Sequence, residues 1–177
     1  MNKSKICKII TPLILAVAIA SGVSPVGAEA PAVDPVRTEI VQAITAQERD
    51  LTCLADNIYH EARGEGAQGW SAVAHVTMNR VHNQAFPNSV CQVVRARNRR
   101  GCQFSWVCTK KGRSTTHRGS ELYAEIRKFA HRFLHTRTGR DMTRGALFYH
   151  AVTVSPTRWK RARIRETARI GRHIFYK

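Results

Sequence analysis

Apolar side chains recur at helical spacing between positions 51 and 62, and this run constrains the fold more than any other feature of the chain. It predicts a helix whose buried face is formed by Leu51, Leu54, Ala55, Ile58 and Ala62. The helix is expected to end near Arg63 and Gly64, because glycine takes the left-handed conformation that stops a helix. Glu61 therefore lies in the last turn of an apolar helix.

The rest of the chain after position 50 predicts further helices and then a small sheet. Residues 86–89 form a turn with good helix-capping residues, and Ser120 is a second cap. The predicted elements are, in order, a helix over 68–81, a short helix over 90–94, a loop or small hairpin over 95–118, a helix over 120–134, and paired strands over 146–152 and 172–176. We expect an α+β fold, mainly helical, in a single domain with a small late β-sheet.

The sequence divides into a signal peptide over 1–28, a linker over 29–50 and one domain over 51–177. Three lysines precede an apolar run over 9–20, and Val26-Gly27-Ala28 offers a small-residue cleavage site. The run is shorter than the roughly 20 residues that a membrane-spanning helix needs. The alternative is an uncleaved membrane anchor. We expect an exported protein of the periplasm or cell envelope, without a membrane span after cleavage.

Four cysteines remain after the signal, namely Cys53, Cys91, Cys102 and Cys108. An even number suits an oxidising compartment, where disulfides persist. Cys102 and Cys108 could close a short loop, and Cys53 would then pair with Cys91, although the sequence alone does not fix the pairing. A zinc site is the alternative, but the spacing contains no CxxC pair.

The chain is strongly basic, with a formal net charge of +17. Loss of the three signal lysines, with no acid lost, would leave +14. Such a charge attracts polyanions, which for an exported protein are the cell wall, the membrane surface and stray nucleic acid. We predict wall binding without specific nucleic-acid recognition. The alternative is a solvated basic surface that only aids solubility.

Acidic residues are few, which limits the candidates for a general acid. Those after position 50 are Asp56, Glu61, Glu65, Glu121, Glu125, Asp141 and Glu166. A carboxylic acid gives up a proton near neutral pH only if its pKa is raised, as burial against apolar groups does. Glu61, on the apolar helix and next to Tyr59, is the strongest candidate. The alternative is an ordinary surface glutamate paired with Arg63 or a lysine.

A second carboxylate for Glu61 is hard to find. Most glycosidases use two. Glu65 is the nearest in sequence, but Gly64 and Gly66 are expected to break the helix between them, and Glu121 begins another helix. We therefore favour a mechanism in which the sugar's own 6-hydroxyl attacks the anomeric carbon. One acid that later acts as base then suffices, and the product is an anhydro sugar.

Aromatic and polar side chains that could bind a sugar accompany Glu61. Aromatic rings stack on the apolar faces of pyranoses, and neighbouring amide, hydroxyl and imidazole groups supply hydrogen bonds. The candidates for substrate binding are Tyr59, His60, Glu65, Gln103, Phe104, Ser105, Trp106, Tyr149, His150 and Trp159. For Phe104 and Trp159 the alternative is a place in the core.

The sequence contains no convincing metal site, and we predict no metal and no cofactor. His60-Glu61 resembles the start of HExxH, but Gly64 occupies the position of the second histidine. His150 and His173 could bind zinc with a third ligand, although no spacing rule selects them. A thiol nucleophile is excluded if the cysteines are paired.

Several segments together resemble one known family. They are Ile58-Tyr59-His60-Glu61-Ala62-Arg63-Gly64-Glu65, Met78-Asn79-Arg80-Val81, Phe86-Pro87-Asn88-Ser89-Val90, Cys102-Gln103-Phe104-Ser105-Trp106, Tyr149-His150-Ala151, and Ile170-Gly171-Arg172-His173-Ile174-Phe175-Tyr176. Taken together they are similar to the SleB/CwlJ family of cell-wall hydrolases. The resemblance covers nearly all of the chain after position 50.

The resemblance implies a peptidoglycan hydrolase, and in the spore-germination members a lytic transglycosylase with a lysozyme-related fold. It implies that Glu61 is the catalytic glutamate, and that a monomer cuts the glycan strand between N-acetylmuramic acid and N-acetylglucosamine. The basic stretch over 95–118 departs from the family, and the signal and cysteines indicate a Gram-negative envelope rather than a spore. The alternatives are a metal-dependent wall amidase or peptidase, and a non-enzymatic cationic wall-binding module.

Overall fold

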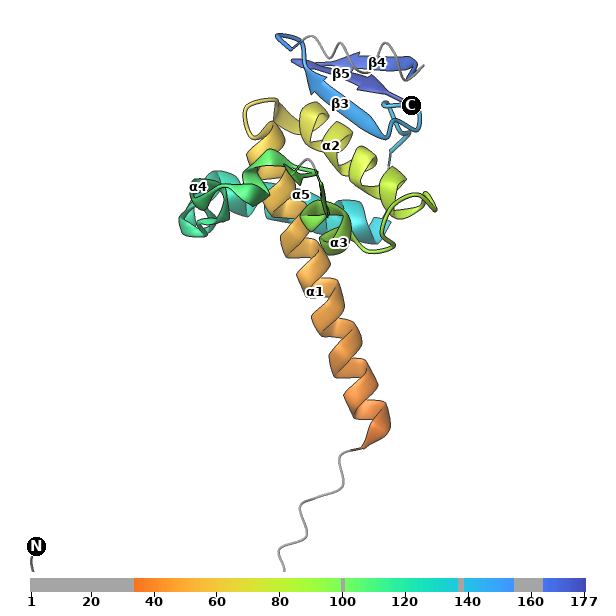
Figure 1. Cartoon of the computed structure of the whole chain (residues 1–177). Coiled ribbons are helices and arrows are strands. Elements are labelled where there is room, and N and C mark those ends of the chain that lie inside the picture. Colours follow the sequence, from red (N-terminus) through yellow and green to blue (C-terminus); the bar gives the residue numbers. More distant parts are fainter. Residues whose placement is uncertain (1–33, 100, 137–138, 155–163) are drawn as a thin grey trace, which may run out of the picture. The chain divides into compact units, whose positions relative to one another are not determined.

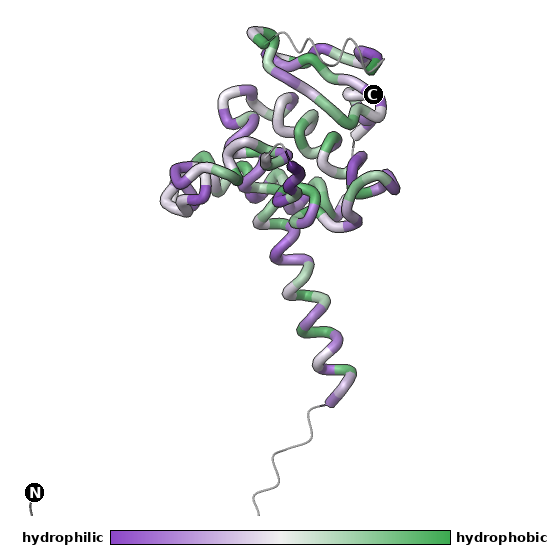
Figure 2. Tube along the Cα trace, viewed as in Figure 1, coloured by the Kyte–Doolittle hydropathy of each residue, from purple (hydrophilic) through white to green (hydrophobic). Residues whose placement is uncertain are grey.

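Helix α1 runs without a break from Pro35 to Ala62, in a computed structural model that describes residues 34–99, 101–136, 139–154 and 164–177. Asp34 caps its first turn by accepting a hydrogen bond from the Val36 N–H at 2.9 Å. Its first half is exposed, and hydrophobic and hydrophilic residues alternate along it (Figure 2). Its second half, from Leu51, is buried. The predicted signal peptide and Trp159 lie outside the described residues.

The stretch predicted as a linker over 29–50 is helical from Pro35 onward, where it forms the first half of α1. Between Pro35 and Gly64 the sequence holds no further glycine or proline, so nothing stops a helix that has begun at Asp34. The end near Arg63 is as predicted, since α1 stops at Ala62. The left-handed glycine of the following turn, however, is Gly66 (φ 66°) and not Gly64.

Three helices pack against the buried half of α1, namely α2 (Gly66–Val81), α3 (Val90–Arg95) and α5 (Glu121–Thr136). The predicted caps are confirmed. Ser89 accepts from the Gln92 N–H at 3.4 Å, and Ser120 accepts from the Tyr123 N–H at 3.2 Å. The core between the helices includes Leu54, Ile58, Val73, Val94, Ile126 and Phe133.

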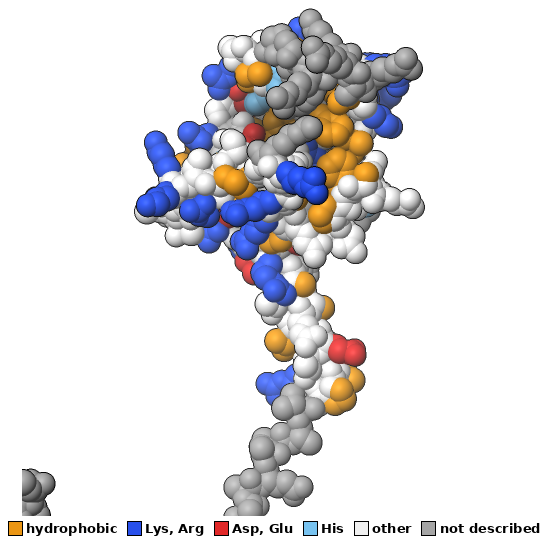
Figure 3. All heavy atoms as spheres, in the orientation of Figure 1, with side chains coloured by type: hydrophobic (Ala, Val, Ile, Leu, Met, Phe, Trp, Pro, Cys, Tyr) orange, Lys and Arg blue, Asp and Glu red, His pale blue; other side chains and the backbone are white. Residues whose placement is uncertain are grey.

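The basic stretch between α3 and α5 is a chain of short elements. It starts as a hairpin of β1 (Arg97–Asn98) and β2 (Gly101–Cys102), as the sequence suggested. The 3-10 helix η1 (Ser105–Cys108), the short helix α4 (Lys110–Arg113) and the 3-10 helix η2 (Thr116–Gly119) follow. Lys and Arg side chains gather around the α4 end of the domain (Figures 1 and 3).

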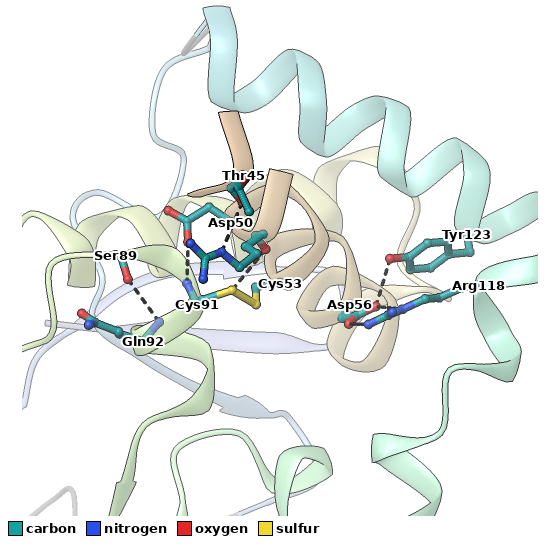
Figure 4. Close-up of a disulfide and its surroundings, with 10 residues drawn as sticks. Thr45, Asp50, Cys53, Asp56, Ser89, Cys91, Gln92, Arg118 and Tyr123 are labelled. Atoms are coloured by element: carbon teal, nitrogen blue, oxygen red, sulfur yellow. Dashed lines mark hydrogen bonds and ion pairs between the residues drawn. A yellow bond between two sulfur atoms is a disulfide. The ribbon is translucent and has the colours of Figure 1, made fainter. Parts of the chain in front are cut away.

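All four predicted disulfide cysteines are paired. Cys102 and Cys108 close a loop from β2 to η1. Cys53 and Cys91 join α1 to α3, and the Asp50 carboxylate beside them accepts the Cys91 N–H at 2.9 Å (Figure 4). Of the three possible connectivities, the structure therefore selects the one that ties the first core helix to the third.

A three-stranded antiparallel sheet follows α5 and has the order β3-β5-β4. Strands β3 (Phe148–Ala151) and β5 (His173–Tyr176) are the pair that the sequence predicted. Strand β4 (Glu166–Ile170) was not predicted, because its polar residues and a bulge between Glu166 and Ala168 hide the alternation of a strand. Phe175 of β5 packs on Ala72 and Val76, so the sheet lies against α2 (Figure 1).

The described residues form one compact unit, Asp34–Lys177. It is mainly helical with a small late sheet, which confirms the predicted α+β class. No helix within the described ranges combines the length and the apolar character needed to cross a bilayer.

Candidate active site

Glu61 opens onto a cavity at the junction of the helices and the sheet. Glu61 lies in the last turn of α1, and its carboxylate points toward Tyr149 of β3. The cavity has a volume of about 240 Å³. It is lined by Glu61, Arg80, Gln103, Phe104, Ser105, Phe148 and Tyr149. Segments far apart in the sequence therefore meet around this acid.

The environment of Glu61 favours its protonated form. Burial raises the pKa of the carboxyl group above its ordinary value, and this effect outweighs two opposing ones. The Tyr149 hydroxyl donates a hydrogen bond to Oε2 at 3.0 Å, and the positive charge of Arg80 lies nearby; both lower the pKa. Glu61 can therefore give up a proton and afterwards be stabilised as an anion by Tyr149 and Arg80.

Arg80 of α2 forms a cationic wall of the same cavity. Its Nε donates to the Leu147 carbonyl at 2.7 Å. The guanidinium lies over the rings of three phenylalanines, with its Cζ 5.1 Å from the centroid of Phe104, 5.5 Å from Phe86 and 5.9 Å from Phe148. Phe104, predicted as a sugar-binding residue with the core as the alternative, is only 4% exposed, so its ring serves both the core and the cavity wall.

A second, larger groove of about 600 Å³ adjoins the cavity through Ser105, which lines both. Two stacked ring pairs line it. Tyr59 stacks on His117 with centroids 4.5 Å apart, and His60 stacks on Trp106 at 4.4 Å. Arg63 and Lys111 add positive charge. The structure thus brings Tyr59, His60, Ser105 and Trp106, which the sequence analysis named as candidates for substrate binding, together in one groove.

His60 is neutral at physiological pH. Burial, followed by the charges of His117 and Arg63, lowers its pKa to about 4, against a smaller opposing effect of Asp56. Its Nε2 is buried and has no hydrogen-bond partner within the described chain. The ring therefore acts in the groove as an uncharged aromatic surface.

The groove residues are fixed by two polar groups of α1 that sequence reasoning missed. The buried Asp56 accepts from the Tyr123 hydroxyl at 2.9 Å and from Arg118 Nε at 3.1 Å (Figure 4). It also contacts His117 Nε2 at 3.3 Å. The fully buried Asn57 accepts from the Trp106 indole N–H at 3.1 Å. The sequence signal that could have revealed Asp56 and Asn57 was two polar residues within an apolar helix. Buried polar groups need hydrogen-bond partners, so such residues indicate a polar contact in the core.

Two predicted binding residues within the described ranges lie outside both the Glu61 cavity and the adjoining groove. Glu65 accepts from Arg172 through its backbone N–H at 2.9 Å and its Nε at 2.6 Å, which lowers the pKa of Glu65 and ties the start of α2 to the β4–β5 turn. A Cβ at Gly171 (φ 55°) would collide with Glu65 Oε2, so this approach requires glycine. His150 contacts the Tyr176 hydroxyl at 2.9 Å and its neighbour's carbonyl at 2.7 Å. Both residues thus have structural partners.

The described residues contain no cluster of three or more histidine, cysteine, aspartate or glutamate side chains with the geometry to hold a metal ion. His150, which the sequence paired with His173 as a weak zinc candidate, stacks on Tyr176. His173 meets the Tyr149 ring edge to face. Proton transfer is the chemistry that the raised pKa of the Glu61 carboxyl group supports.

Comparison with known proteins finds a matching family and similar sequences and structures. The model of the Cell Wall Hydrolase family matches residues 64–176. The spore cortex-lytic enzyme of Bacillus subtilis (strain 168) is 32% identical over 129 residues, covering 71% of this chain and 37% of that enzyme. The spore cortex-lytic enzyme of Bacillus cereus is 30% identical over 131 residues, covering 73% and 45%. The chain thus spans less than half the length of these relatives.

A solved structure is also similar, the catalytic domain of the germination-specific lytic transglycosylase SleB from Bacillus anthracis. It shares 30% identity with a TM-score of 0.55, over 73% of this chain and 95% of that domain. The family match begins three residues after Glu61 and therefore does not include that residue. Because the match covers well over half of the sequence, the chain belongs to the Cell Wall Hydrolase family.

Proposed function

We propose that this protein is a lytic transglycosylase that cuts the glycan strand of peptidoglycan between N-acetylmuramic acid and N-acetylglucosamine, with Glu61 as general acid and then base. The observation that carries the proposal is a carboxyl group with a raised pKa, buried beside Tyr149 in a cavity with aromatic walls. The names of the similar proteins, a lytic transglycosylase and spore cortex-lytic enzymes, support the same activity.

The reaction needs one acid used twice. Glu61 donates its proton to the glycosidic oxygen while the bond from that oxygen to the anomeric carbon breaks. The 6-hydroxyl oxygen of the same muramic acid residue attacks the anomeric carbon, and the Glu61 carboxylate accepts the hydroxyl proton. The reaction gives two strands. One ends in a sugar with a free 4-hydroxyl, and the other ends in a 1,6-anhydro-muramic acid residue. Glu61 returns to its protonated form.

The surroundings of the other acids favour this mechanism over one with two carboxylates. Among the described residues that line the cavity, Glu61 is the one carboxylate. Glu65 is engaged by Arg172. Asp141 accepts from Asn79 at 3.0 Å and from the Thr143 N–H at 2.8 Å. A hydrolase of the two-carboxylate type needs a second carboxyl group about 5–9.5 Å from the acid.

The adjoining groove offers a path for the rest of the strand. Its ring faces suit the apolar faces of pyranoses, and its cations Arg63 and Lys111 suit the carboxylates of peptidoglycan. We place the enzyme in the cell envelope as an exported protein, in agreement with its two disulfides and its basic charge. Wall binding is then expected to weaken as salt is raised.

Mass spectrometry of the muropeptides released from purified sacculi tests the proposal. We expect strands that end in 1,6-anhydro-N-acetylmuramic acid. Reducing ends in place of anhydro ends would contradict the one-carboxylate mechanism. A cut stem peptide, lost on treatment with a chelator, would instead identify a metal-dependent amidase or peptidase.

A further inference from the structure

Arg80 is a buried cation in the wall of the Glu61 cavity. Within the described residues it forms no salt bridge, although the Glu61 carboxyl group of the same cavity interacts with its charge. The residue is 3% exposed. Its contacts are the Leu147 carbonyl, through Nε, and the faces of Phe86, Phe104 and Phe148. Its Nη1 is buried and has no hydrogen-bond partner in the described part of the chain. A charged donor is therefore held rigidly with unused hydrogen-bonding capacity.

The charge is costly to keep in this position. Burial lowers the pKa of Arg80 to about 10, which still leaves the guanidinium protonated at neutral pH. Buried charges are normally paired, and buried donors are normally satisfied. Cation–π contacts with three rings offset part of the cost, but they leave Nη1 without an acceptor. Because Arg80 lines the cavity, its guanidinium can meet an acceptor that a ligand brings.

The shape and chemistry of the cavity define that acceptor. Arginine carries donors only, so it pairs best with a carbonyl or carboxylate oxygen, which only accepts. The rings of Phe104 and Phe148 beside it favour a methyl group. Two substituents of a peptidoglycan strand combine a methyl group with such an oxygen, namely the acetamido group and the lactyl group of muramic acid.

We propose that Arg80 recognises the substrate by donating from its guanidinium to the carbonyl-type oxygen of one of these substituents, whose methyl group packs on Phe104 and Phe148. This inference rests on the proposed function and adds the feature of the sugar that is recognised. Bound in this way, the substituent fixes the rotation of the pyranose, so that the glycosidic oxygen faces Glu61. The ligand also supplies a further acceptor for the Arg80 guanidinium.

Kinetics with Arg80→Met and Arg80→Lys on three forms of substrate test the proposal. The forms are native sacculi, N-deacetylated sacculi, and strands whose stem peptides have been removed, which converts the lactyl amide to a carboxylate. On native sacculi we expect Arg80→Met to lower kcat/KM about tenfold or more, the range for losing a hydrogen bond from a charged donor. Arg80→Lys keeps the charge but not the planar geometry, and should be intermediate.

The pattern across substrates identifies the group. If Arg80 binds the acetamido oxygen, deacetylation lowers the wild-type rate but has little further effect on Arg80→Met. If it binds the lactyl oxygen, stem removal strengthens binding by the wild type, because a carboxylate replaces an amide, and leaves Arg80→Met unchanged. An equal loss for Arg80→Met on all three substrates, or no loss on any, overturns the inference.

A second measurement covers the case in which the Arg80 variants do not fold. The guanidinium resonances of Arg80 in the ¹⁵N-labelled Glu61→Gln protein should shift when native glycan strands bind, and an absent shift overturns the inference. The proposed function fails separately, if the wild type does not cleave native sacculi or if Glu61→Gln does.

Discussion

Replacement of Glu61 by glutamine is expected to slow cleavage of peptidoglycan strands by about two to four orders of magnitude, the usual contribution of a general acid or base. Glutamine has nearly the same shape and can still accept the hydrogen bond from Tyr149. It cannot give up a proton to the leaving oxygen or take one from the attacking hydroxyl. Release of soluble muropeptides from sacculi, with protein bound to the sacculi measured in parallel, separates lost chemistry from lost binding.

The same variant is expected to be more stable than the wild type at pH 7. The pKa of Glu61 is raised in the folded protein, so its contribution to stability is complete below the unfolded pKa and is lost as the pH rises through the folded value. The gain in melting temperature for Glu61→Gln should therefore be present at neutral pH and vanish in acid.

Glu65→Gln is the matched control for Glu61→Gln. The pKa of Glu65 is lowered by its bonds to Arg172, so its contribution is present above the unfolded pKa and is lost as the pH falls. This variant should be destabilised at pH 7 yet keep most of its activity. The assignment of Glu61 is contradicted if Glu61→Gln cleaves within tenfold of the wild-type rate, or if Glu65→Gln is the inactive one.

Removal of the Cys53–Cys91 disulfide is expected to have the largest effect on stability. The two cysteines are 38 residues apart, and Cys53 is 3% exposed in the core. In the chain-entropy description, a closed loop of that length stabilises the folded state by about 4 kcal/mol. The double variant Cys53→Ala/Cys91→Ala should unfold at a correspondingly lower urea concentration, with full activity per folded molecule.

The second disulfide provides the comparison. Cys102 and Cys108 are only 6 residues apart, so the same description gives about 2 kcal/mol for Cys102→Ala/Cys108→Ala. This loop carries Gln103, Phe104 and Ser105 of the cavity wall. Its loss should therefore reduce activity more than the loss of the longer link does. A larger loss of stability for the short loop than for the long one would contradict the expectation.

The parts of the site that the sequence predicted are those set by local signals. The place of Glu61 follows from apolar spacing and from the glycines after Arg63, both visible within a few turns. The caps Ser89 and Ser120 and the pairing of β3 with β5 are equally local or pattern-based. Tyr149 was selected as an aromatic residue of a predicted strand, and in the fold its hydroxyl contacts Glu61.

The parts that the sequence could not predict depend on contacts between distant segments. In the sequence Arg80 has no feature that separates it from other basic helix residues. Its place in the cavity depends on Phe86, Phe104 and Phe148, which come from other segments. Glu65 looked like a site residue because it lies close to Glu61 in sequence, but Arg172, 107 positions away, binds it. The helix before Leu51 was missed although Val36, Ile40 and Ile44 recur at helical spacing, and these side chains remain exposed.

An NMR titration of the Glu61 carboxyl carbon, assigned by comparison with Glu61→Gln, tests the central claim most directly. We expect the wild type to titrate above the ordinary value of 4.5. In Tyr149→Phe the carboxylate loses its hydrogen-bond donor, so the pKa should rise further. A Glu61 that titrates at or below 4.5, with no response to Tyr149→Phe, would show an acid already ionised at neutral pH and would contradict the mechanism.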